Sequence, residues 1–555
     1  SGSPAVDIDS GRGQMRRAWL LVALAAALAA AALLQTRGAP VPPLAGWFPP
    51  GPALYLEAKD FAGLLASWNA SAEKTRWLGS ANYEVFRRSR LFMRLEQAHQ
   101  EYAAAAGVPA DMNLVAGIAG AEAALALYDV GQIEFLYVSR VPSARALESV
   151  LWRAKERFDS RHAAGIAYYA RTEPASRRTA AFAVHEGLFF LATREELLAG
   201  ALALVAGRSQ GSLLREGWFE QAARAGGQPG DLRLALHIPE LVRSPHFRSY
   251  WIHRNVSKLR PFAAGVVDLR RSAAEFREER VLVRAPGQRV APPDESPVGA
   301  VMALAGDDAG FYRAVLAPEP NAVVAAIRAK IFGEPLAAPV SSTSAPLPEV
   351  APAGAGSEAD LGTRIDEAPY VGSGGAAAAA PLTGFLEPRE VRAMLEVTSS
   401  RAMPDGAFVF SEPVIVLLGA ADWDLAAARA ALTASGSSLW GVSFGAAARG
   451  PLLAIARNQA AAEAILSKPP RAGVAGASYI AGYNHLREFP HYVRLMRLLD
   501  SPPFQADPNV EPEPPFFSAN LASLGQVLSR MRDASIVVRD TGGELRQTVV
   551  YRMSP

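Results

Sequence analysis

A serine between two glycines, followed later by two histidines, is the pattern in this chain that could carry catalysis. Residues 441–445 fit the G-x-S-x-G motif, in which a sharp strand-to-helix turn presents a nucleophile, here Ser443, to a histidine base. His485 and His491 follow in the order that such a serine hydrolase requires. Residues 446–456 contain no segment for the helix that would complete an oxyanion hole, and they predict a strand instead. We therefore predict a strand flanked by glycines, and keep a serine hydrolase using Ser443 as an alternative.

Other reactive residue types are sparse. Ser71 and Lys74 fit the S-x-x-K pattern of penicillin-recognising enzymes, but no Ser-Asp-Asn or Lys-Thr-Gly accompanies them. The eight histidines form no H-x-x-x-H pair with a neighbouring acid, so the sequence predicts no metal site. The absence of cysteine excludes disulfides, thiolate catalysis, iron–sulfur clusters and acylation of a lipoprotein cysteine. We expect no cofactor and no enzymatic activity.

Two stretches combine aromatic and basic residues, as helices on an anionic membrane surface do. One runs from residue 77 to residue 102 and holds four arginines among phenylalanines and a methionine. The other lies at residues 246–260. A core-facing aromatic stripe with a solvated basic edge is the alternative for both stretches. The second stretch supplies the residues that we select as candidates for surface binding, which are Arg248, Tyr250, Trp251 and Arg254.

An internal repeat predicts the architecture. A short apolar strand that ends in a polar bend before an aromatic-bearing helix occurs four times, beginning at residues 53, 234, 300 and 479. The first and third copies lie about 247 residues apart, and the second and fourth about 245. Near-equal offsets indicate two tandem related halves. Strands and helices interleave irregularly around antiparallel pairs in each half, which predicts an α+β fold with an antiparallel or mixed sheet and packed helices.

Composition places the boundaries between these units. Residues 285–297 are rich in proline and favour an extended linker between a first α+β domain, 48–284, and a second, 298–555. Residues 334–381 are dominated by Ala, Pro, Ser and Gly, and we interpret them as an insertion in the second domain.

The N-terminal part holds one uninterrupted apolar run, residues 18–34. As a helix it would be about 25 Å long, close to the ~30 Å hydrocarbon core of a bilayer. Basic residues precede the run, so residues 1–17 are predicted to be a cytoplasmic tail or an upstream extension and the bulk to be exported. Residues 35–47 would link the run to the first domain. The interpretation is a single-pass signal-anchor helix in the inner membrane, with secretion to the periplasm after cleavage as the alternative. The anchor residues are Ala18, Trp19, Leu20, Leu21, Leu33 and Leu34.

Overall composition excludes some partners. The chain of 555 residues has 56 basic and 54 acidic side chains, so its net charge of +2 predicts no binding to nucleic acid. Half of the residues are hydrophobic, which is enough for two or three domains with real cores.

The whole pattern resembles a group of uncharacterised bacterial envelope proteins. The resemblance lies in the basic start, the single apolar run, the phrase Phe-Pro-Pro-Gly-Pro-Ala-Leu-Tyr-Leu at residues 48–56 and the duplicated α+β body. It implies a location and no catalytic residues. We therefore expect a membrane-tethered periplasmic protein that binds a partner protein, an envelope polymer or a lipid, with the groove between the halves as the expected surface. A lipid or lipoprotein carrier is a further alternative.

Overall fold

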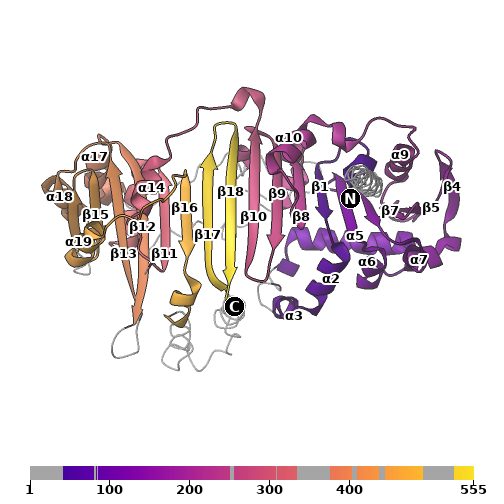
Figure 1. The fold of residues 1–555 in the computed structure, drawn as a ribbon, viewed down its shortest axis with the longest axis horizontal. Coiled ribbons are helices and arrows are strands. Elements are labelled where there is room, and N and C mark those ends of the chain that lie inside the picture. The colour runs from indigo at the N-terminus through magenta and orange to yellow at the C-terminus, as the bar shows by residue number, and fades with distance from the viewer. Residues whose placement is uncertain are drawn as a thin grey trace, which may run out of the picture.

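The described part of the chain forms one antiparallel sheet of 18 strands with helices packed on both faces (Figure 1). The computed structural model describes residues 42–79, 83, 86–250, 256–307, 309–333, 376–402, 409–436, 444–491 and 531–554. The strand order is β4-β5-β6-β7-β3-β2-β1-β8-β9-β10-β18-β17-β16-β11-β12-β13-β15-β14, and each neighbouring pair is antiparallel. The predicted α+β class with an antiparallel sheet is confirmed.

The strands fall into two groups along the chain. The first ten are β1 (Leu54–Ala58), β2 (Glu122–Asp129), β3 (Glu134–Arg140), β4 (Asp159–Ala163), β5 (Ile166–Thr172), β6 (Thr179–His185), β7 (Leu188–Ala192), β8 (Leu232–His237), β9 (Phe262–Arg271) and β10 (Glu275–Arg284). The other eight are β11 (Phe311–Leu316), β12 (Val391–Ala402), β13 (Val409–Gly419), β14 (Gly445–Arg449), β15 (Leu452–Ala456), β16 (Tyr479–Tyr483), β17 (Met531–Asp540) and β18 (Glu544–Met553).

Helices connect most of these strands. In the first group they are η1 (Leu44–Trp47), α2 (Phe61–Ala70), α3 (Ala72–Leu78), α5 (Arg90–Ala106), α6 (Met112–Ile118), α7 (Ser143–Leu147), α8 (Val150–Arg153), η2 (Lys155–Arg157), α9 (Glu195–Val205), η3 (Leu213–Arg215), α10 (Gly217–Gly226), α11 (Ile238–Arg243), α12 (Pro245–Tyr250) and α13 (Val256–Leu259). In the second group they are η4 (Pro286–Gln288), α14 (Ser296–Met302), α15 (Pro320–Lys330), α17 (Ala376–Leu386), α18 (Leu425–Ser435) and α19 (Gln459–Ser467).

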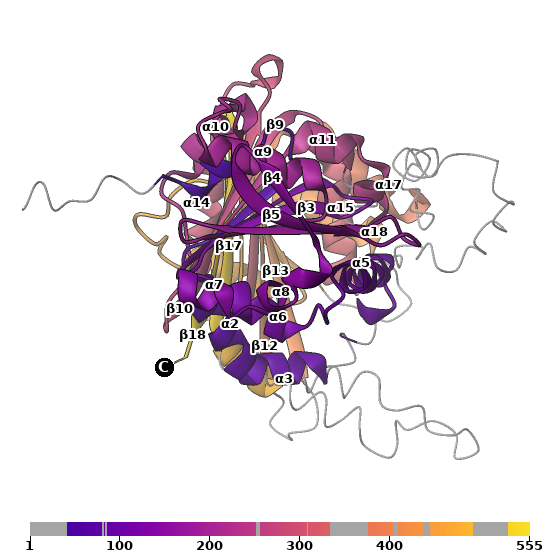
Figure 2. The ribbon, with the colours of Figure 1, turned by 90° about the vertical axis from the view of Figure 1, so that its right-hand side faces the viewer.

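Within each half, helices pack on both faces of the sheet because many strands there are apolar on both sides, whereas β10, β17 and β18 at the centre are mostly half-buried. Residues paired across antiparallel strands share a face, so Tyr55 and Ile480 lie on one side and Tyr137 and Ile415 on the other. The Tyr55 face is packed by η1, α9 and α10 in the first half and by α14 and α19 in the second. The opposite face is packed by α5 to α8 and by α15, α17 and α18. Figure 2 shows the sheet edge-on with helices on either side.

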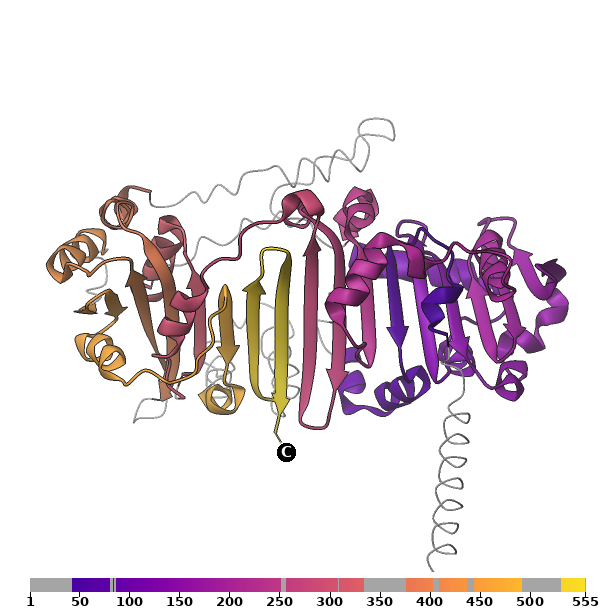
Figure 3. The same ribbon diagram turned by 45° about the horizontal axis from the view of Figure 1, so that its top comes forward.

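The two halves meet through a pair of edge strands. Figure 3 shows β17 and β18 in yellow beside β10 and β9 in pink, all in one continuous sheet. The register between β10 and β18 places Glu279 opposite Thr548. The Thr548 hydroxyl donates a hydrogen bond to the Glu279 carboxylate at 2.7 Å. The two halves are therefore joined by a strand ladder.

The same eight-strand order occurs twice. In the first half it is β6-β7-β3-β2-β1-β8-β9-β10, and in the second it is β14-β15-β13-β12-β11-β16-β17-β18. β4 and β5 extend the sheet beyond β6 in the first half only. The two orders run in opposite directions away from the β10–β18 pair.

Several boundaries differ from those predicted. The third repeat, expected as a strand from residue 300, is the end of helix α14, and the strand is β11, which begins at Phe311. Part of the predicted linker 35–47 is the turn η1, whose Leu44 and Ala45 are buried in the first core. The predicted linker 285–297 contains η4 and the start of α14. The predicted insertion 334–381 overlaps α17, which begins at Ala376.

Candidate functional site

The strongest candidate for a binding surface is a helical layer at one edge of the first half, which we call the aromatic–basic layer. It consists of α2, α3, Tyr83, residues 86–89 and α5, and it contains most of the stretch 77–102. Figure 1 shows α2 and α3 below β1. The layer leaves a hollow of about 530 Å³, lined by Arg87, Arg88, Phe92, Met93, Gln97 and Gln100 with Glu96.

Local sequence fixes the ends of these helices. Asp60 caps α2 by accepting from the Gly63 amide at 3.0 Å, and Ser89 caps α5 by accepting from the Phe92 amide at 3.1 Å. Ser71 caps α3 in the same way, accepting from the Lys74 amide at 3.1 Å. The S-x-x-K pattern is therefore explained by helix capping, because its serine hydroxyl is bound to the α3 amide and to the Trp68 carbonyl.

Four aromatic rings form a half-exposed cluster in this layer. Trp77 lies 6.0 Å from Tyr83 and 6.3 Å from Phe86, measured between ring centroids. Phe92 closes the cluster at 5.3 Å from Phe86 and 6.3 Å from Tyr83. None of the four rings belongs to the five buried core clusters of the described chain. The four rings thus contact one another, in three of the four pairs edge-to-face, and lie outside the main core.

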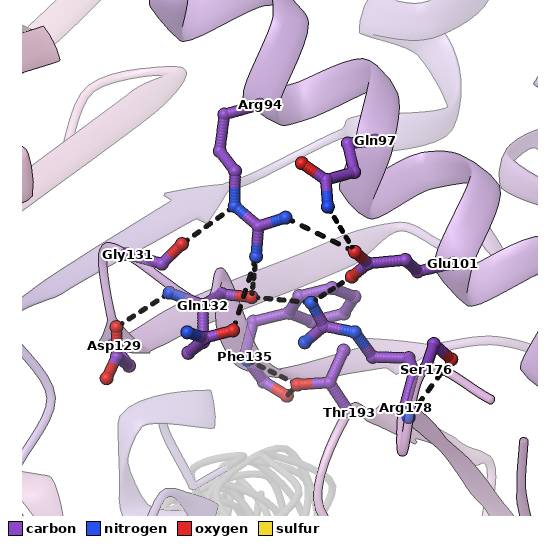
Figure 4. Close-up of polar contacts among 10 residues, drawn as sticks. All are labelled: Arg94, Gln97, Glu101, Asp129, Gly131, Gln132, Phe135, Ser176, Arg178 and Thr193. Carbon is purple, nitrogen blue, oxygen red and sulfur yellow. Dashed lines mark hydrogen bonds and ion pairs between the residues drawn. The ribbon is translucent and has the colours of Figure 1, made fainter. Parts of the chain in front are cut away.

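An ion-pair network fixes α5 to the sheet beneath it (Figure 4). Glu101 accepts from Arg178 Nη2 at 2.7 Å and from Gln97 at 2.7 Å, and Arg94 lies 3.5 Å away. Burial alone would raise the pKa of Glu101, but the hydrogen bond from Arg178, its charge, Gln97 and Arg94 together lower it. Arg178 comes from the segment before β6, so the network joins residues 77 positions apart.

The two arginines also bind the turn between β2 and β3. Arg94 Nε donates to the Gly131 carbonyl at 2.8 Å, and Arg178 Nη2 donates to the Gln132 carbonyl at 2.8 Å. Asp129 holds the same turn by accepting from the Gln132 amide at 2.8 Å. The guanidinium groups of Arg94 and Arg178 donate to groups within the protein, namely backbone carbonyls and the Glu101 carboxylate. We therefore assign this network the role of positioning helix α5 on the sheet. The outer side of the layer, with its rings and exposed guanidinium groups, is the part that can contact a ligand.

We predict that Glu101→Gln will weaken the attachment of α5. The substitution leaves the largely buried Arg178 guanidinium without its carboxylate, and an unsatisfied group of this kind costs about 1–3 kcal/mol. Hydrogen exchange of the α5 amides measures this local opening free energy. Glu96→Gln, on the exposed side of the same helix, is the matched control and should change it by less than about 0.5 kcal/mol.

The same measurement has a predicted pH dependence. Because the folded state lowers the pKa of Glu101, its stabilising contribution is present above the ordinary value of 4.5 and is lost as the pH falls through the lowered pKa. The wild-type α5 amides should therefore lose protection below pH 4.5 and Glu101→Gln should not show this loss. Equal protection of the two proteins at neutral pH would contradict the role given to Glu101.

Comparisons with known proteins identify no family. No family model matches the sequence, and no curated protein matches it. Four solved chains match in structure, among them crystal forms I, III and IV of TP0453. They share 14%, 12% and 13% identity with this chain, cover 45%, 44% and 44% of it and 81% of their own length, and have TM-scores of 0.25, 0.24 and 0.23. At these TM-scores the likeness carries no argument about fold or function.

The residues selected from the sequence for surface binding lie at the edge of the described chain. Arg248 and Tyr250 are in α12, whose Phe247 is buried against α11, but their side chains are outside the described residues. Trp251 and Arg254 are outside them altogether, as are the anchor residues Ala18, Trp19, Leu20, Leu21, Leu33 and Leu34. Within the described ranges, none of the helices combines the length and the apolar character needed to cross a bilayer.

The serine motif also falls at a boundary. Ser443 is outside the described residues, and the chain resumes at Phe444 and enters strand β14 at Gly445. The expected strand after the motif is therefore present. His485 begins a helical segment after β16, and its ring lies 4.5 Å from Tyr483. Burial lowers the pKa of His485. In the described ranges, no group of three or more His, Asp or Glu side chains is placed to hold a metal ion.

Proposed function

We propose that this chain is a membrane-tethered, extracytoplasmic binding protein whose body arose by duplication of one eight-stranded unit. The apolar run 18–34 supplies the tether, and the aromatic–basic layer supplies the binding surface. The observation that carries the binding role is the half-exposed ring cluster of Trp77, Tyr83, Phe86 and Phe92, which lies outside the five buried cores. Exposed aromatic rings beside guanidinium groups are characteristic of interaction surfaces.

The duplication is supported by the register at the junction. β10 begins at residue 275 and β18 at residue 544, which is 269 residues later. The same offset of 269 residues separates the start of β9 at residue 262 from the start of β17 at residue 531. Glu279 and Thr548 are related by this shift and also face each other. Equivalent strands thus pair about a local two-fold axis, which is the geometry of an isologous dimer interface.

The hairpin turns of the two halves support it further. The Ser272 hydroxyl accepts from the Glu275 amide at 3.0 Å, and the Thr541 hydroxyl accepts from the Glu544 amide at 3.1 Å. The Ser272 and Thr541 amides both return a hydrogen bond, each 2.9 Å long, to the carbonyl of the same glutamate. Both glutamates are followed two residues later by an arginine. One turn structure is therefore built twice from related residues.

The tether is tested in a bacterial host with the full chain, whose lack of cysteine makes single-cysteine labelling simple. We expect the chain to stay in the membrane pellet after alkaline carbonate extraction. We also expect Val290→Cys, at an exposed site, to react with an impermeant maleimide when only the outer membrane is permeabilised. Extraction by carbonate, or reaction only after the cells are lysed, would contradict the proposal.

The binding role is tested by placing a photo-reactive residue at Trp77. We expect adducts with a membrane or envelope component from this position, because its ring is exposed in the ring cluster. Leu486 is the matched control, since it is an exposed apolar residue in the second half. The absence of adducts from position 77, or equal adducts from both positions, would contradict the binding role while leaving the tether standing.

A further inference from the structure

The second half of the apolar helix α2 is exposed. Phe61, Leu64 and Leu65 in its first half are partly buried, whereas residues 66–70, which include Trp68, are exposed, and none of the ten residues is fully buried. Its first turn is fixed to the body, where the Ala62 amide donates to the Gly120 carbonyl at 3.1 Å and the Phe61 and Tyr137 ring centroids lie 6.3 Å apart. A surface helix of a soluble protein ordinarily presents an apolar stripe to a core, so this exposure indicates a partner outside the fold.

The exposed residues continue through α3. Trp68 is 44% exposed, Trp77 41% and Leu78 45%. Figure 1 places α3 below β1 and on the far side of α2 from that strand. Tryptophan at the boundary between an apolar phase and water is favoured at membrane surfaces, because its ring is apolar and its N–H remains hydrated.

Positive charge accompanies this exposed apolar surface. Arg87 and Arg88 are exposed at the edge of the same layer, and Lys74 lies on α3 between the two tryptophans in sequence. The Lys74 ammonium donates a hydrogen bond to the Asn69 side chain at 2.6 Å, and this contact is exposed to solvent. Basic side chains beside an apolar helical surface complement the negative potential of anionic lipid headgroups.

The described chain begins close to the same edge of the sheet. The Pro42 carbonyl accepts a hydrogen bond from Arg140, which ends β3 and is paired with Glu122 at the start of β2. Gly120, which fixes the first turn of α2, immediately precedes that strand. Seven residues, 35–41, separate Pro42 from the apolar run, and they span at most about 25 Å. A tether at residues 18–34 would therefore keep this edge near the bilayer.

We propose that α2 and α3 dock on the anionic bilayer surface that holds the tether, with Trp68, Trp77 and Leu78 in the interface and the neighbouring basic residues at the headgroups. This inference rests on the proposed function and names the component that the aromatic–basic layer binds. Docking gives the body a second contact with the membrane and orients the sheet relative to it.

The test uses the full chain in nanodiscs of phosphatidylethanolamine and phosphatidylglycerol. Leu78→Cys carries an environment-sensitive fluorophore, and Val290→Cys, 53% exposed and distant from α3, is the matched control. A label that lies at the depth of an interfacial helix, about 5–10 Å below the surface, should be quenched by iodide roughly threefold less than the control label. Its emission should shift to the blue, whereas that of the control should not.

Two further measurements identify the occupant. Arg88→Glu in the Leu78→Cys chain, or phosphatidylcholine in place of the lipid mixture, should restore quenching toward that of the control. Equal quenching at both positions in the anionic discs would overturn the inference, and so would equal protection in phosphatidylcholine. Protection that rises with protein concentration in detergent would identify a second copy as the occupant and overturn it too. In each case a chain that resists carbonate extraction leaves the proposed tether intact.

Discussion

Replacing Asp268 by valine alone will destabilise the first half by about 3–5 kcal/mol, because it leaves a buried guanidinium without its carboxylate. Arg233 on β8 and Asp268 on β9 are 7% and 1% exposed, and they are joined by two hydrogen bonds of 2.8 and 2.7 Å. Asp268 also accepts from the Gly230 amide at 2.9 Å, and Arg233 donates to the Gly227 carbonyl at 2.9 Å. The pair therefore joins two strands to the loop after α10.

The double substitution Arg233→Ile with Asp268→Val will recover most of that loss. The equivalent cross-strand pair in the second half is Ile480 on β16 opposite Val537 on β17, so the fold already accepts two apolar residues here. Replacing both members of a buried ion pair by packed apolar residues is often neutral or stabilising. The remaining cost should come from Gly230 and from the loop, which lose their bonds to the pair.

Hydrogen exchange of the β8 and β9 amides in the full chain measures both variants. The single variant should exchange much faster than wild type, and the double variant should lie close to wild type. Amides of β16 and β17 serve as an internal control, since they belong to the other half of the sheet. A double variant as unstable as the single one would contradict the equivalence of the two strand pairs.

The second half shows the reverse arrangement on the opposite face of the sheet. Arg313 on β11 pairs with the buried Glu396 on β12, where the first half has Leu56 opposite Leu125. Side-chain alternation predicts only which residues share a face, and it predicts strands poorly when charged residues occupy core positions. Arg313 interrupts the apolar pattern at the centre of β11, whereas Arg233 of β8 precedes the apolar run 234–236, which is one physical reason why β8 was predicted and β11 was not.

The third repeat was misplaced for a related reason. A short apolar run such as residues 300–305 fits a buried strand or a buried helix equally well. Pro297 lies in the first turn of α14, where proline favours a helix start, and this signal distinguishes the two structures. The strands around residues 135, 188, 414 and 452 were predicted because each is rich in apolar residues with high β-strand propensity and is bounded by turn-forming residues. The hairpin of β17 and β18 was predicted from its Gly-Gly turn.

The candidate site was only partly predictable. Its composition could be recognised because aromatic and basic residues cluster locally between residues 77 and 102. The network that positions α5 could not, because Arg178 is distant in sequence and its partners are backbone carbonyls as well as Glu101. The exposure of α2 was equally hidden, since its apolar sequence predicts burial.

Replacing Phe48 by alanine will destabilise the first half by about 3–5 kcal/mol, the usual cost of truncating a buried phenylalanine. Phe48 opens the phrase at residues 48–56 and is fully buried. Its ring lies 5.3 Å from Tyr55, and Tyr55 lies 5.3 Å from Phe219 of α10. Its carbonyl also accepts from the Leu213 amide at 2.9 Å. The phrase is therefore a structural element that joins η1, β1 and α10.

Leu56→Ala provides the matched control within the same phrase. Leu56 is adjacent to Tyr55 but points to the other face of β1 and is 39% exposed, so its truncation should cost less than about 1.5 kcal/mol. Urea denaturation of the full chain in detergent, followed by far-UV circular dichroism, gives the shift of the first unfolding midpoint for both variants. Equal shifts for the two variants would show that burial on the Tyr55 face does not set the stability of this half. A large shift for Phe48→Ala alone would identify the aromatic packing behind the phrase as the reason that residue is phenylalanine.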